Sequence, residues 1–423
     1  AVKITMKAVF ICHSDNGGGA AVVTLRLVRA LRAAGVDASM LVSHRASGDR
    51  SVTLAGNVFS RKSAFLRECA DIFLHNGFNR SDLFKVSTAA AGLPLHRHPL
   101  VRQADVVVLS WINQGTLSLR EIARISAMGR KIVWTMHDMW NMTGICHHAG
   151  ECSRYAAGGT CGLCPMIHRS RPSVSDISHR TWLRKRELYS RVPVTFVAVS
   201  SWLASCARSS SLLADARIEM IPNAFPLDGF RIRPLSTRAA LGLPERGRII
   251  LMGAQRLDDP IKGFDIAIEA LNRLHDRIEA GTAPEACAVF FGALRDRSIL
   301  DSLRLPYRWL GTVSDPAMIP ELYAHGDVVM SSSLYETLPG TLVEGMASGC
   351  RAVSFGRGGQ SDIIDRPDLG CIAEYLSPES LARCLESCLV ADSDRELLRR
   401  SVAEKFAAEA VASRYVALFD GEN

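Results

Sequence analysis

Two glutamates, Glu336 and Glu344, lie eight positions apart around a Pro-Gly pair in the last quarter of this 423-residue chain. Carboxylates can accept hydrogen bonds from sugar hydroxyls or from a ribose diol. A helix that begins between them would also offer free backbone N–H groups to a phosphate. One short stretch could therefore hold both ends of a nucleotide sugar. By residue type alone, two solvated glutamates near a helix start are an equal alternative.

The residues around this pair specify a strand and a helix. Asp327-Val-Val-Met-Ser331 reads as a short buried strand. Pro339 fits the first turn of a helix, where its missing N–H is harmless, and Gly349 can end that helix in a left-handed conformation. Glu344 lies one turn into the helix, with its side chain leaning toward the N-terminal end. We expect four residues at the helix start to form the anion-binding backbone: Leu338, Pro339, Gly340 and Thr341.

The flanking segments extend this pattern over about 248–365. Trp309-Leu-Gly-Thr-Val-Ser-Asp-Pro316 and Leu322-Tyr-Ala-His-Gly-Asp327 precede it, and Cys350-Arg-Ala-Val-Ser-Phe-Gly-Arg-Gly-Gly359 follows it. In this order, these motifs and the E-x7-E segment resemble the retaining glycosyltransferases of family four, which have the GT-B fold. The resemblance implies an α/β protein of two Rossmann-like, doubly wound domains that face each other across a cleft. It implies Glu344 on the nucleoside and Glu336 on the donor sugar.

Length and composition agree with two globular domains, because 423 residues exceed one compact core. Hydrophobic residues make up 48% and charged residues 22%, and no apolar run approaches the roughly 20 residues of a spanning helix. Twelve cysteines without a secretory leader fit the reducing cytoplasm, where thiols or metal ligands are expected rather than disulfides. The net charge of +7 favours anionic ligands or the anionic inner face of a membrane, and does not single out nucleic acid.

The N-terminal part predicts a βαβ unit with a glycine-rich first turn. Residues 7–13 read as a strand, Asn16-Gly-Gly-Gly19 as the turn, and 19–34 as a helix with an apolar face. The glycines do not fit G-x-G-x-x-G, and the second strand ends in His44-Arg45 without an acidic residue for a ribose. The resemblance implies that the backbone of Gly18 and Gly19 lies near the diphosphate and the acceptor. A tight strand-to-helix turn is the alternative.

His137 ends another expected strand, in Trp134-Thr-Met-His-Asp-Met-Trp140. Ligands of open α/β sheets bind beyond the carboxyl ends of strands. By itself such a histidine is more often packed than catalytic, but the resemblance implies that His137 contacts the donor sugar. We expect Asp138 to orient a neighbour or cap a turn. Asn223, where a strand leaves the first domain, could line the cleft or hold the turn.

Four cysteines follow within nineteen residues, with the spacing C-x5-C-x8-C-x2-C: Cys146, Cys152, Cys161 and Cys164. They could close a tetrahedral structural zinc site, with His147 or His148 in place of one cysteine. Free buried thiols and disulfides are the alternatives. Full ligation would leave no open position, so such a zinc would have no catalytic role.

A basic helical stretch covers residues 180–191 and includes Trp182, Arg184, Lys185 and Tyr189. A solvated helix face is the slightly preferred interpretation. The alternative is contact with a lipid-linked acceptor at an anionic membrane surface.

In the second domain, Arg256 and Lys262 resemble the family's paired basic residues for the donor diphosphate, with a spacing one residue longer than the common form. Fixed cations there would stabilise the charge that develops on the leaving diphosphate. Exposed loop cations are the alternative. The resemblance also places the backbone of Thr312 and Val313 at the nucleobase, in a UDP- or GDP-linked donor.

We therefore expect an acceptor-side domain over 1–228 with a cysteine-rich insertion at 146–164, a donor-binding domain over 229–402, and a C-terminal helix in 403–423 that could cross back. The expected function is metal-independent transfer of a sugar, with retention, from a nucleotide sugar to a saccharide or lipid-linked oligosaccharide in polysaccharide biosynthesis. His137, Arg256, Lys262 and Glu336 would be the catalytic residues. A nucleotide-sugar epimerase and a non-enzymatic, zinc-stabilised anion-binding protein are the competing interpretations.

Overall fold

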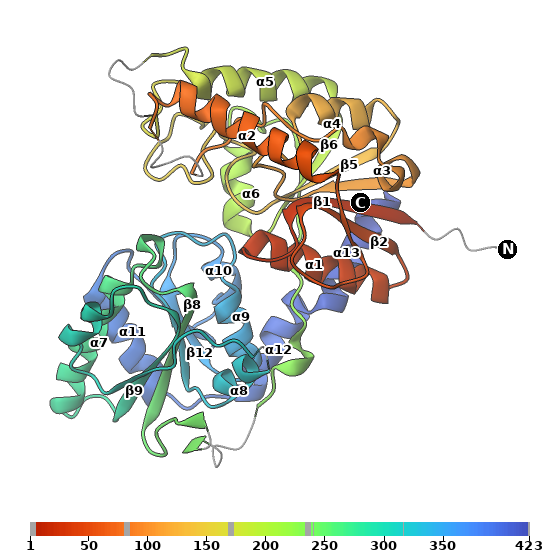
Figure 1. Ribbon diagram of the computed structural model, residues 1–423. Coiled ribbons are helices and arrows are strands. Elements are labelled where there is room, and N and C mark those ends of the chain that lie inside the picture. Colours follow the sequence, from red (N-terminus) through yellow and green to blue (C-terminus); the bar gives the residue numbers. More distant parts are fainter. Residues whose placement is uncertain are drawn as a thin grey trace. The chain divides into compact units, whose positions relative to one another are not determined.

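The computed structural model describes residues 6–79, 85–167, 173–232, 238–239, 241–315 and 317–421. It divides into two compact units (Figure 1). Unit 1 comprises the chain up to Ala224 together with Val411 onward, and unit 2 comprises Phe225–Ala410. The sequence placed this boundary after residue 228. Pro316 of the expected nucleobase segment lies outside the described residues.

Unit 1 is built on a seven-stranded parallel sheet in the order β3-β2-β1-β4-β5-β6-β7. Its central strands are continuous apolar runs buried on both faces, as parallel sheets covered by helices require. The strands are β1 (Lys7–Ser14), β2 (Asp37–His44), β3 (Val52–Leu54), β4 (Val106–Leu109), β5 (Lys131–Met136), β6 (Val194–Ala198) and β7 (Arg217–Met220). The helices are α1 (Gly19–Ala33), α2 (Val58–His75), α3 (Pro99–Gln103), α4 (Leu119–Ser126), α5 (Ile177–Arg191), α6 (Ser201–Arg208) and α13 (Ala408–Asp420).

Unit 2 has a six-stranded parallel sheet in the order β10-β9-β8-β11-β12-β13. Its strands are β8 (Arg248–Arg256), β9 (Ala286–Ala293), β10 (Tyr307–Trp309), β11 (Val328–Ser331), β12 (Arg351–Phe355) and β13 (Gly370–Ala373). Its helices are α7 (Phe264–Glu279), α8 (Met318–Ala324), α9 (Gly340–Ala347), α10 (Gln360–Ile363), α11 (Pro378–Val390) and α12 (Arg395–Phe406). Helices α7 and α11 pack on one apolar core with the sheet, around Phe264, Phe290 and Leu385. The predicted α/β, doubly wound class is confirmed in both units.

Each sheet reverses its strand order once, between β1 and β4 in unit 1 and between β8 and β11 in unit 2. Open α/β sheets bind ligands at the carboxyl ends of the strands beside such a switch point. Three of the predicted site segments follow this rule, whereas His137 follows β5 and Thr312 follows the edge strand β10. The glycine-rich turn comes after β1, Arg256 ends β8, and Glu336 comes after β11.

The C-terminal residues form two helices rather than one. The chain turns at Ala407, between α12 and α13. Within unit 1, the hydroxyls of Tyr415 and Thr135 lie 3.0 Å apart, and the Lys131 ammonium donates to the Leu418 carbonyl at 2.7 Å. These contacts tie α13 to β5.

The cysteines differ from the expectation at one place. Cys371 on β13 and Cys384 on α11 form a disulfide, whereas the other ten cysteines are free. The pair lies where β13 packs on α11, in the core of unit 2. Among the described residues, no helix is long and apolar enough to cross a membrane.

Candidate active site

Helix α9 presents an uncapped N-terminus in unit 2. We had expected Pro339 in the first helical turn, but it is the N-cap residue, one position earlier. Its side chain makes no capping hydrogen bond. The first turn contains no acidic residue. At the other end, Gly349 has φ of 88°, and the Cys350 N–H donates to the Gly345 carbonyl at 3.0 Å, as a left-handed helix end requires. The N–H groups of Gly340 and Thr341 therefore remain suited to an anion.

Close packing fixes the start of this helix. A Cβ on Gly340 would lie 2.9 Å from Cε1 of Phe225, which is nearer than real Cβ contacts come. A Cβ on Gly345 would lie 2.6 Å from Cγ1 of Val329 on β11. Glycine at these positions lets α9 lie directly on the sheet, so its N-terminus has a defined position beyond β11.

The backbone of Glu336 is held by the loop after β12. Glu336 pairs with Gly358 in an isolated parallel bridge, and the Gly359 N–H donates to the Glu336 carbonyl at 3.0 Å. Gly358 has φ of 147°, and a Cβ there would lie 1.9 Å from the Glu336 oxygen. Only glycine fits this position. The Gly-Arg-Gly-Gly motif at 356–359 thus supports the predicted sugar-binding glutamate.

Lys262 and Glu336 form an ion pair, with 2.5 Å between Nζ and Oε1. The lysine is placed by the loop after β8, which is attached to the exit of β11. Ser332 donates from its hydroxyl to the Lys262 carbonyl at 2.8 Å, and the Leu334 N–H donates to the Ile261 carbonyl at 2.8 Å. Gly263 has φ of 56°, and a Cβ there would lie 2.5 Å from the Ser332 oxygen. Two residues predicted separately are thereby brought together.

Arg256 has different partners. Its guanidinium lies 3.3 Å from a carboxylate oxygen of Asp258 and 3.3 Å from one of Asp259. Asp258 also accepts the Arg295 N–H at 3.0 Å, so this cation belongs to an acidic loop. Lys262 pairs with Glu336 and Arg256 with the two aspartates, so the structure does not bring the predicted pair of cations to one partner.

The other predicted donor contacts of unit 2 are dispersed around the sheet. Glu344 is half-buried on α9. Burial, and after it the nearby Glu344 carboxylate, raise the pKa of Tyr323 well above its usual value. Thr312 and Val313 follow the edge strand β10; Thr312 is exposed and Val313 is half-buried.

In unit 1, the glycine-rich turn lies at the carboxyl end of β1. Gly17 has φ of 86°, which favours glycine, whereas Gly18 is in an extended conformation open to any residue. Open space surrounds the Cβ positions of Gly18 and Gly19. Asp15 anchors the turn by accepting the N–H groups of Ala46 at 2.7 Å and Ser47 at 2.9 Å. Packing does not demand the second and third glycines, which leaves room for a ligand to approach the backbone.

His137 and Asn223 line one small pocket, together with residues of α1, β5 and α13 and one residue directly after β4. The remaining lining residues are Val23, Thr24, Leu27, Ser110, Thr135, Pro222, Ala224 and Tyr415. The pocket has a volume of about 10 Å³, close to the space of a single water and far below that of a sugar ring. Burial lowers the pKa of His137 to about 4, so its imidazole is neutral at pH 7.

Asp138, next to His137, organises a buried polar network. Its carboxylate accepts from the Trp140 N–H at 2.8 Å and the Trp111 indole at 3.0 Å, and lies 2.6 Å from Nδ1 of His147. Burial alone would raise the pKa of Asp138, but the charge and hydrogen bond of His147 together with the Trp140 amide lower it to about 2. Nε2 of His147 lies 3.0 Å from the Ser87 hydroxyl. His147 is therefore engaged away from the cysteines.

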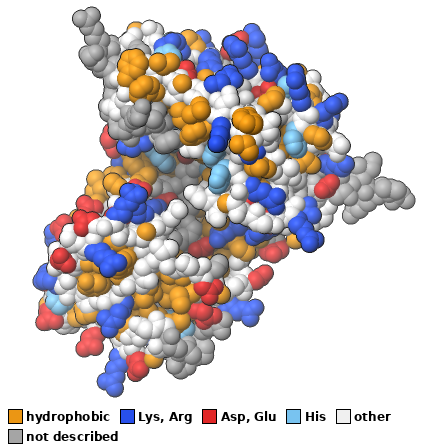
Figure 2. All heavy atoms as spheres, in the orientation of Figure 1, with side chains coloured by type: hydrophobic (Ala, Val, Ile, Leu, Met, Phe, Trp, Pro, Cys, Tyr) orange, Lys and Arg blue, Asp and Glu red, His pale blue; other side chains and the backbone are white. Residues whose placement is uncertain are grey.

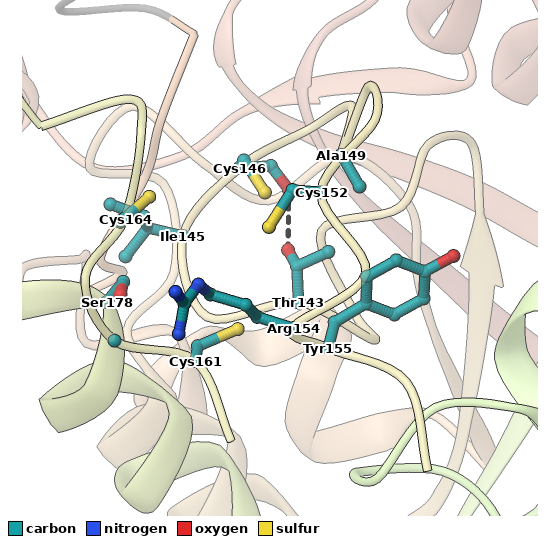
Figure 3. A pocket seen from close by; sticks show the side chains of 11 residues that line it. Thr143, Ile145, Cys146, Ala149, Cys152, Arg154, Tyr155, Cys161, Cys164 and Ser178 are labelled. Atoms are coloured by element: carbon teal, nitrogen blue, oxygen red, sulfur yellow. Dashed lines mark hydrogen bonds between the residues drawn. The ribbon is translucent and has the colours of Figure 1, made fainter. Parts of the chain in front are cut away.

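The four predicted cysteine ligands line a second pocket of unit 1, with a volume of about 20 Å³ (Figure 3). All four are free thiols, and burial raises the pKa of Cys146 to about 11. Among the residues that the structure describes, no three His, Cys, Asp or Glu side chains are placed to hold a metal ion as they stand. The four predicted cysteines therefore lie around one pocket, but their sulfur atoms are not arranged as a metal coordination sphere.

Several supporting residues could not be found from local sequence. Phe225, Ser332 and Gly358 contact site residues far away in the chain, and no spacing rule indicates them. Lys185 is the clearest correction. The sequence placed it on a basic, solvated or membrane-facing helix, but its side chain is fully buried beneath α5. Its ammonium donates to the Trp140 and Thr143 carbonyls.

Comparison with known structures extends over both units. The chain superposes on HepE from Anabaena, solved with UDP and glucose, with a TM-score of 0.64 and 16% identity, covering 98% of this chain and 100% of HepE. Sucrose-phosphate synthase from Thermosynechococcus elongatus gives 0.64 and 15% identity over 99% of each chain. WaaG, a glycosyltransferase of lipopolysaccharide biosynthesis, gives 0.59 and 15%, over 98% of this chain and 100% of WaaG. These matches confirm the GT-B fold.

Sequence relatives match parts of the chain. The provisionally named colanic acid biosynthesis glycosyl transferase WcaC of Escherichia coli (strain K12) is 25% identical over 221 residues, which cover 50% of this chain and 52% of WcaC. The sulfoquinovosyl transferase SQD2 of Arabidopsis thaliana is 29% identical over 169 residues, which cover 40% of this chain and 31% of SQD2. The chain therefore spans about half, or less, of the length of these relatives.

Two family models complete the comparison. The model described as Glycosyl transferases group 1 matches residues 246–391, which hold the α9 and Lys262–Glu336 elements. The model described as Glycosyltransferase Family 4 matches residues 17–228, or 212 of the 423 residues. Since this second match covers half of the sequence, the chain belongs to glycosyltransferase family 4.

Proposed function

We propose that this protein transfers a sugar from a nucleoside-diphosphate sugar, UDP- or GDP-linked, to a saccharide or lipid-linked oligosaccharide, with retention of anomeric configuration. The observation that carries the proposal is the arrangement at α9. The uncapped N-terminus of α9 comes four residues after Glu336, and Glu336 forms an ion pair with Lys262 from the loop after β8. A carboxylate that can bind hydroxyls and N–H groups that can bind an anion therefore lie close together in the chain. The UDP and glucose in the HepE structure belong to a protein of the same fold.

In this proposal the chain supplies positioning and charge. The N–H groups of Gly340 and Thr341, with Lys262, hold the diphosphate and stabilise the charge that grows as it leaves. Glu344 accepts from the ribose hydroxyls, and Glu336 accepts from hydroxyls of the sugar. In unit 1, the neutral His137 can donate one hydrogen bond and accept another. Arg256 contributes once the diphosphate competes for it with Asp258 and Asp259.

The bond changes need no further reactant. The bond between the anomeric carbon and the diphosphate oxygen breaks, and the acceptor oxygen bonds to that carbon on the same face. The acceptor proton passes to the leaving diphosphate. A metal ion has no part in this scheme. The sequence Asp392-Ser-Asp394 has the D-x-D pattern of some metal sites but lies just before α12, where Asp394 caps the helix by accepting the Leu397 N–H at 2.9 Å.

We also propose that unit 1 meets its acceptor at an anionic membrane, through α2 rather than through α5 alone. The inner face of α2 is firmly attached. The buried Glu68 carboxylate accepts four successive backbone N–H groups, those of Thr88, Ala89, Ala90 and Ala91, at 2.8–3.3 Å. This carboxylate holds the helix against the loop before η1 (Leu95–Arg97).

The outer face of α2 is apolar and basic. Phe59 is 84% exposed, Leu66 63% and Leu74 54%, at spacings that place them on one side of the helix. Lys62 and Arg67 are exposed beside them, whereas the two acids of α2, Glu68 and Asp71, point inward. Figure 2 shows hydrophobic side chains interleaved with Lys and Arg on this face of the molecule. Apolar anchors between cations fit the headgroup region of anionic lipid.

The experiment that tests the proposed transfer incubates the protein with radiolabelled nucleotide sugars and a panel of saccharide and lipid-linked acceptors. The expected result is label covalently attached to an acceptor, with release of the nucleoside diphosphate. An altered free nucleotide sugar without transfer would support the epimerase instead. If nucleotide sugars raise the melting temperature of the protein but none of them reacts, the result would support a non-enzymatic anion-binding protein.

A further inference from the structure

The segment between β5 and α5, residues 137–176, has little regular structure of its own. Its described residues contain no helix or strand, and two isolated bridges join Cys146 to Val86 and Ala156 to Ser210. Loops of this length inside a folded unit need some other source of order. The apolar cluster at its base is small and comprises Ile72, Val86, Ile145 and Ile177, with Cys164 packed beside it.

Glycines bring the turns of this segment unusually close together. A Cβ on Gly144 would lie 2.5 Å from the Ser178 carbonyl oxygen and 3.0 Å from Cβ of Cys161. Gly162 has φ of 154°, and a Cβ there would lie 2.4 Å from the Val174 oxygen. The loop is therefore tightly wrapped rather than loosely extended. Something at its centre must favour this wrapping, because the backbone entropy of so many ordered residues opposes it.

The centre of the wrap is the cysteine pocket. Figure 3 shows Cys146, Cys152, Cys161 and Cys164 around it, drawn from three separate turns of the loop. One sulfur already has a polar partner, since the Gly144 N–H donates to Sγ of Cys161 at 3.1 Å. Such N–H donors support metal-bound sulfur by offsetting its charge. The loop thus provides four sulfur ligands and part of their surroundings.

A buried cation lies beside the pocket. The fully buried ammonium of Lys185 donates to the carbonyls of Trp140, at 2.5 Å, and Thr143, at 3.0 Å, and lies 3.4 Å from the centroid of the Trp140 ring. Thr143 itself lines the cysteine pocket. An ammonium is costly to bury unless an opposing charge lies near. The Asp138 carboxylate is one such charge, and four thiolates around a divalent cation, with a net charge of −2, would supply a second.

We propose that Cys146, Cys152, Cys161 and Cys164 bind one structural Zn²⁺. On binding, the four thiols release four protons to solvent and form four Zn–S bonds of about 2.3 Å. The cysteine side chains must turn further into the pocket to reach this geometry, since no three ligands are yet placed around one point among the described residues. With four sulfurs bound, the ion has no open position. Its role is to hold the loop beyond His137, and it takes no part in sugar transfer.

The test is the metal content of the full-length protein, purified without added metal and measured by mass spectrometry. We expect about one zinc per chain, lost in Cys161→Ser and kept in Cys69→Ser, a matched variant of a free cysteine on α2. If Cys161→Ser does not fold, measurements on the wild-type protein still test the zinc site. Its zinc should be released as a mercurial reagent titrates four thiols, and Co²⁺ in its place should show the visible spectrum of a tetrahedral thiolate site.

Three results would overturn the proposal. They are a folded wild-type protein without zinc, zinc retained in Cys161→Ser, and a count of six thiols, instead of the ten free cysteines of the structure, under denaturing, non-reducing conditions. The last result would assign the pocket to two disulfides. None of these measurements depends on enzyme activity, so the zinc site and the proposed transfer fail or stand independently.

Discussion

Lys262 Nζ lies 2.5 Å from Glu336 Oε1, although the two residues are 74 positions apart. One follows β8 and the other follows β11, the two strands at the switch point of unit 2. The pair thus joins a cation suited to a diphosphate with a carboxylate suited to a sugar hydroxyl. Each holds the other in place before a donor binds, which reduces the reorganisation needed when charge develops on the leaving group.

Lys262→Met should remove this cation while keeping the length of the side chain. We expect kcat to fall by about 100- to 1,000-fold, since removing one fixed group that stabilises transition-state charge has an effect of this order. Glu336→Gln should lower kcat too, and the double variant should be less impaired than the product of the single effects, because the residues act as a pair. Steady-state kinetics of the three variants measures this coupling.

The matched control is Lys405→Met, whose ammonium pairs with Asp365 at 2.6 Å elsewhere in unit 2. It should keep wild-type kcat. Full activity in Lys262→Met, or strictly multiplicative effects in the double variant, would contradict the assigned role.

Glu344→Gln should weaken donor binding through the ribose. A charged hydrogen bond contributes about 1.5–3 kcal/mol, so Kd for the nucleoside diphosphate should rise by about 10- to 100-fold. A 2′-deoxy nucleotide should bind the wild-type protein more weakly, and should lose little further in the variant. Titration calorimetry with both nucleotides checks this. An equal loss for both in the variant would show that Glu344 acts elsewhere.

Gly358→Ala should destabilise unit 2 and displace Glu336. The new Cβ would meet the Glu336 oxygen at 1.9 Å, at a φ of 147° that alanine avoids. We expect a loss of about 1–3 kcal/mol in the free energy of unfolding, and lower activity. Urea denaturation measures the first effect. The control is the stability of Gly18→Ala. Gly18 has an extended backbone with open space around it, so this variant should unfold at the same urea concentration as the wild type.

Local sequence patterns were sufficient for the elements that carry the site. Strand β11, the left-handed Gly349 and the turn after β1 follow from residue types alone, because short-range geometry determines them. The Lys262–Glu336 pair, the Glu68 carboxylate under four N–H groups and the buried Lys185 do not. Each depends on which segments the fold brings together. The charges of 180–191 predicted a solvated helix, yet tertiary packing buries one of them completely.

Phe59→Ser with Leu66→Ser should weaken membrane binding. Burying an apolar side chain contributes about 1.5–3 kcal/mol, so the double variant should bind vesicles of phosphatidylglycerol and phosphatidylethanolamine at least tenfold less. Binding should also fall with salt, because Lys62 and Arg67 attract the headgroups. Co-sedimentation measures both. Val390→Ser, at an exposed apolar position on α11 of unit 2, should bind like the wild type.

Absence of vesicle binding by the wild-type protein would refute this surface. A change from dimer to monomer in the double variant, seen by light scattering without a change in vesicle binding, would assign α2 to a second copy of the chain.

Two half-buried histidines of unit 1 should make stability depend on mildly acidic pH. Burial lowers the pKa of His137 to about 4, and burial with the charge of His44 lowers that of His13 to about 4, from 6.5 in the unfolded chain. Below pH 6.5 the unfolded state therefore binds protons that the folded state does not. The stability that neutral imidazoles contribute is complete above pH 6.5 and is lost as pH falls toward 4. Asp138 titrates below this window, because its pKa is about 2.

Urea midpoints between pH 7.5 and 4.5 should therefore decline less steeply in His137→Asn than in the wild type. His13→Asn should show a similar reduction, and the two together should add, because each removes one proton from the difference between the states. Parallel curves for His137→Asn and the wild type would mean that this imidazole binds its proton over the same pH range in the folded protein as in the unfolded chain. That result would contradict the lowered pKa that burial gives His137.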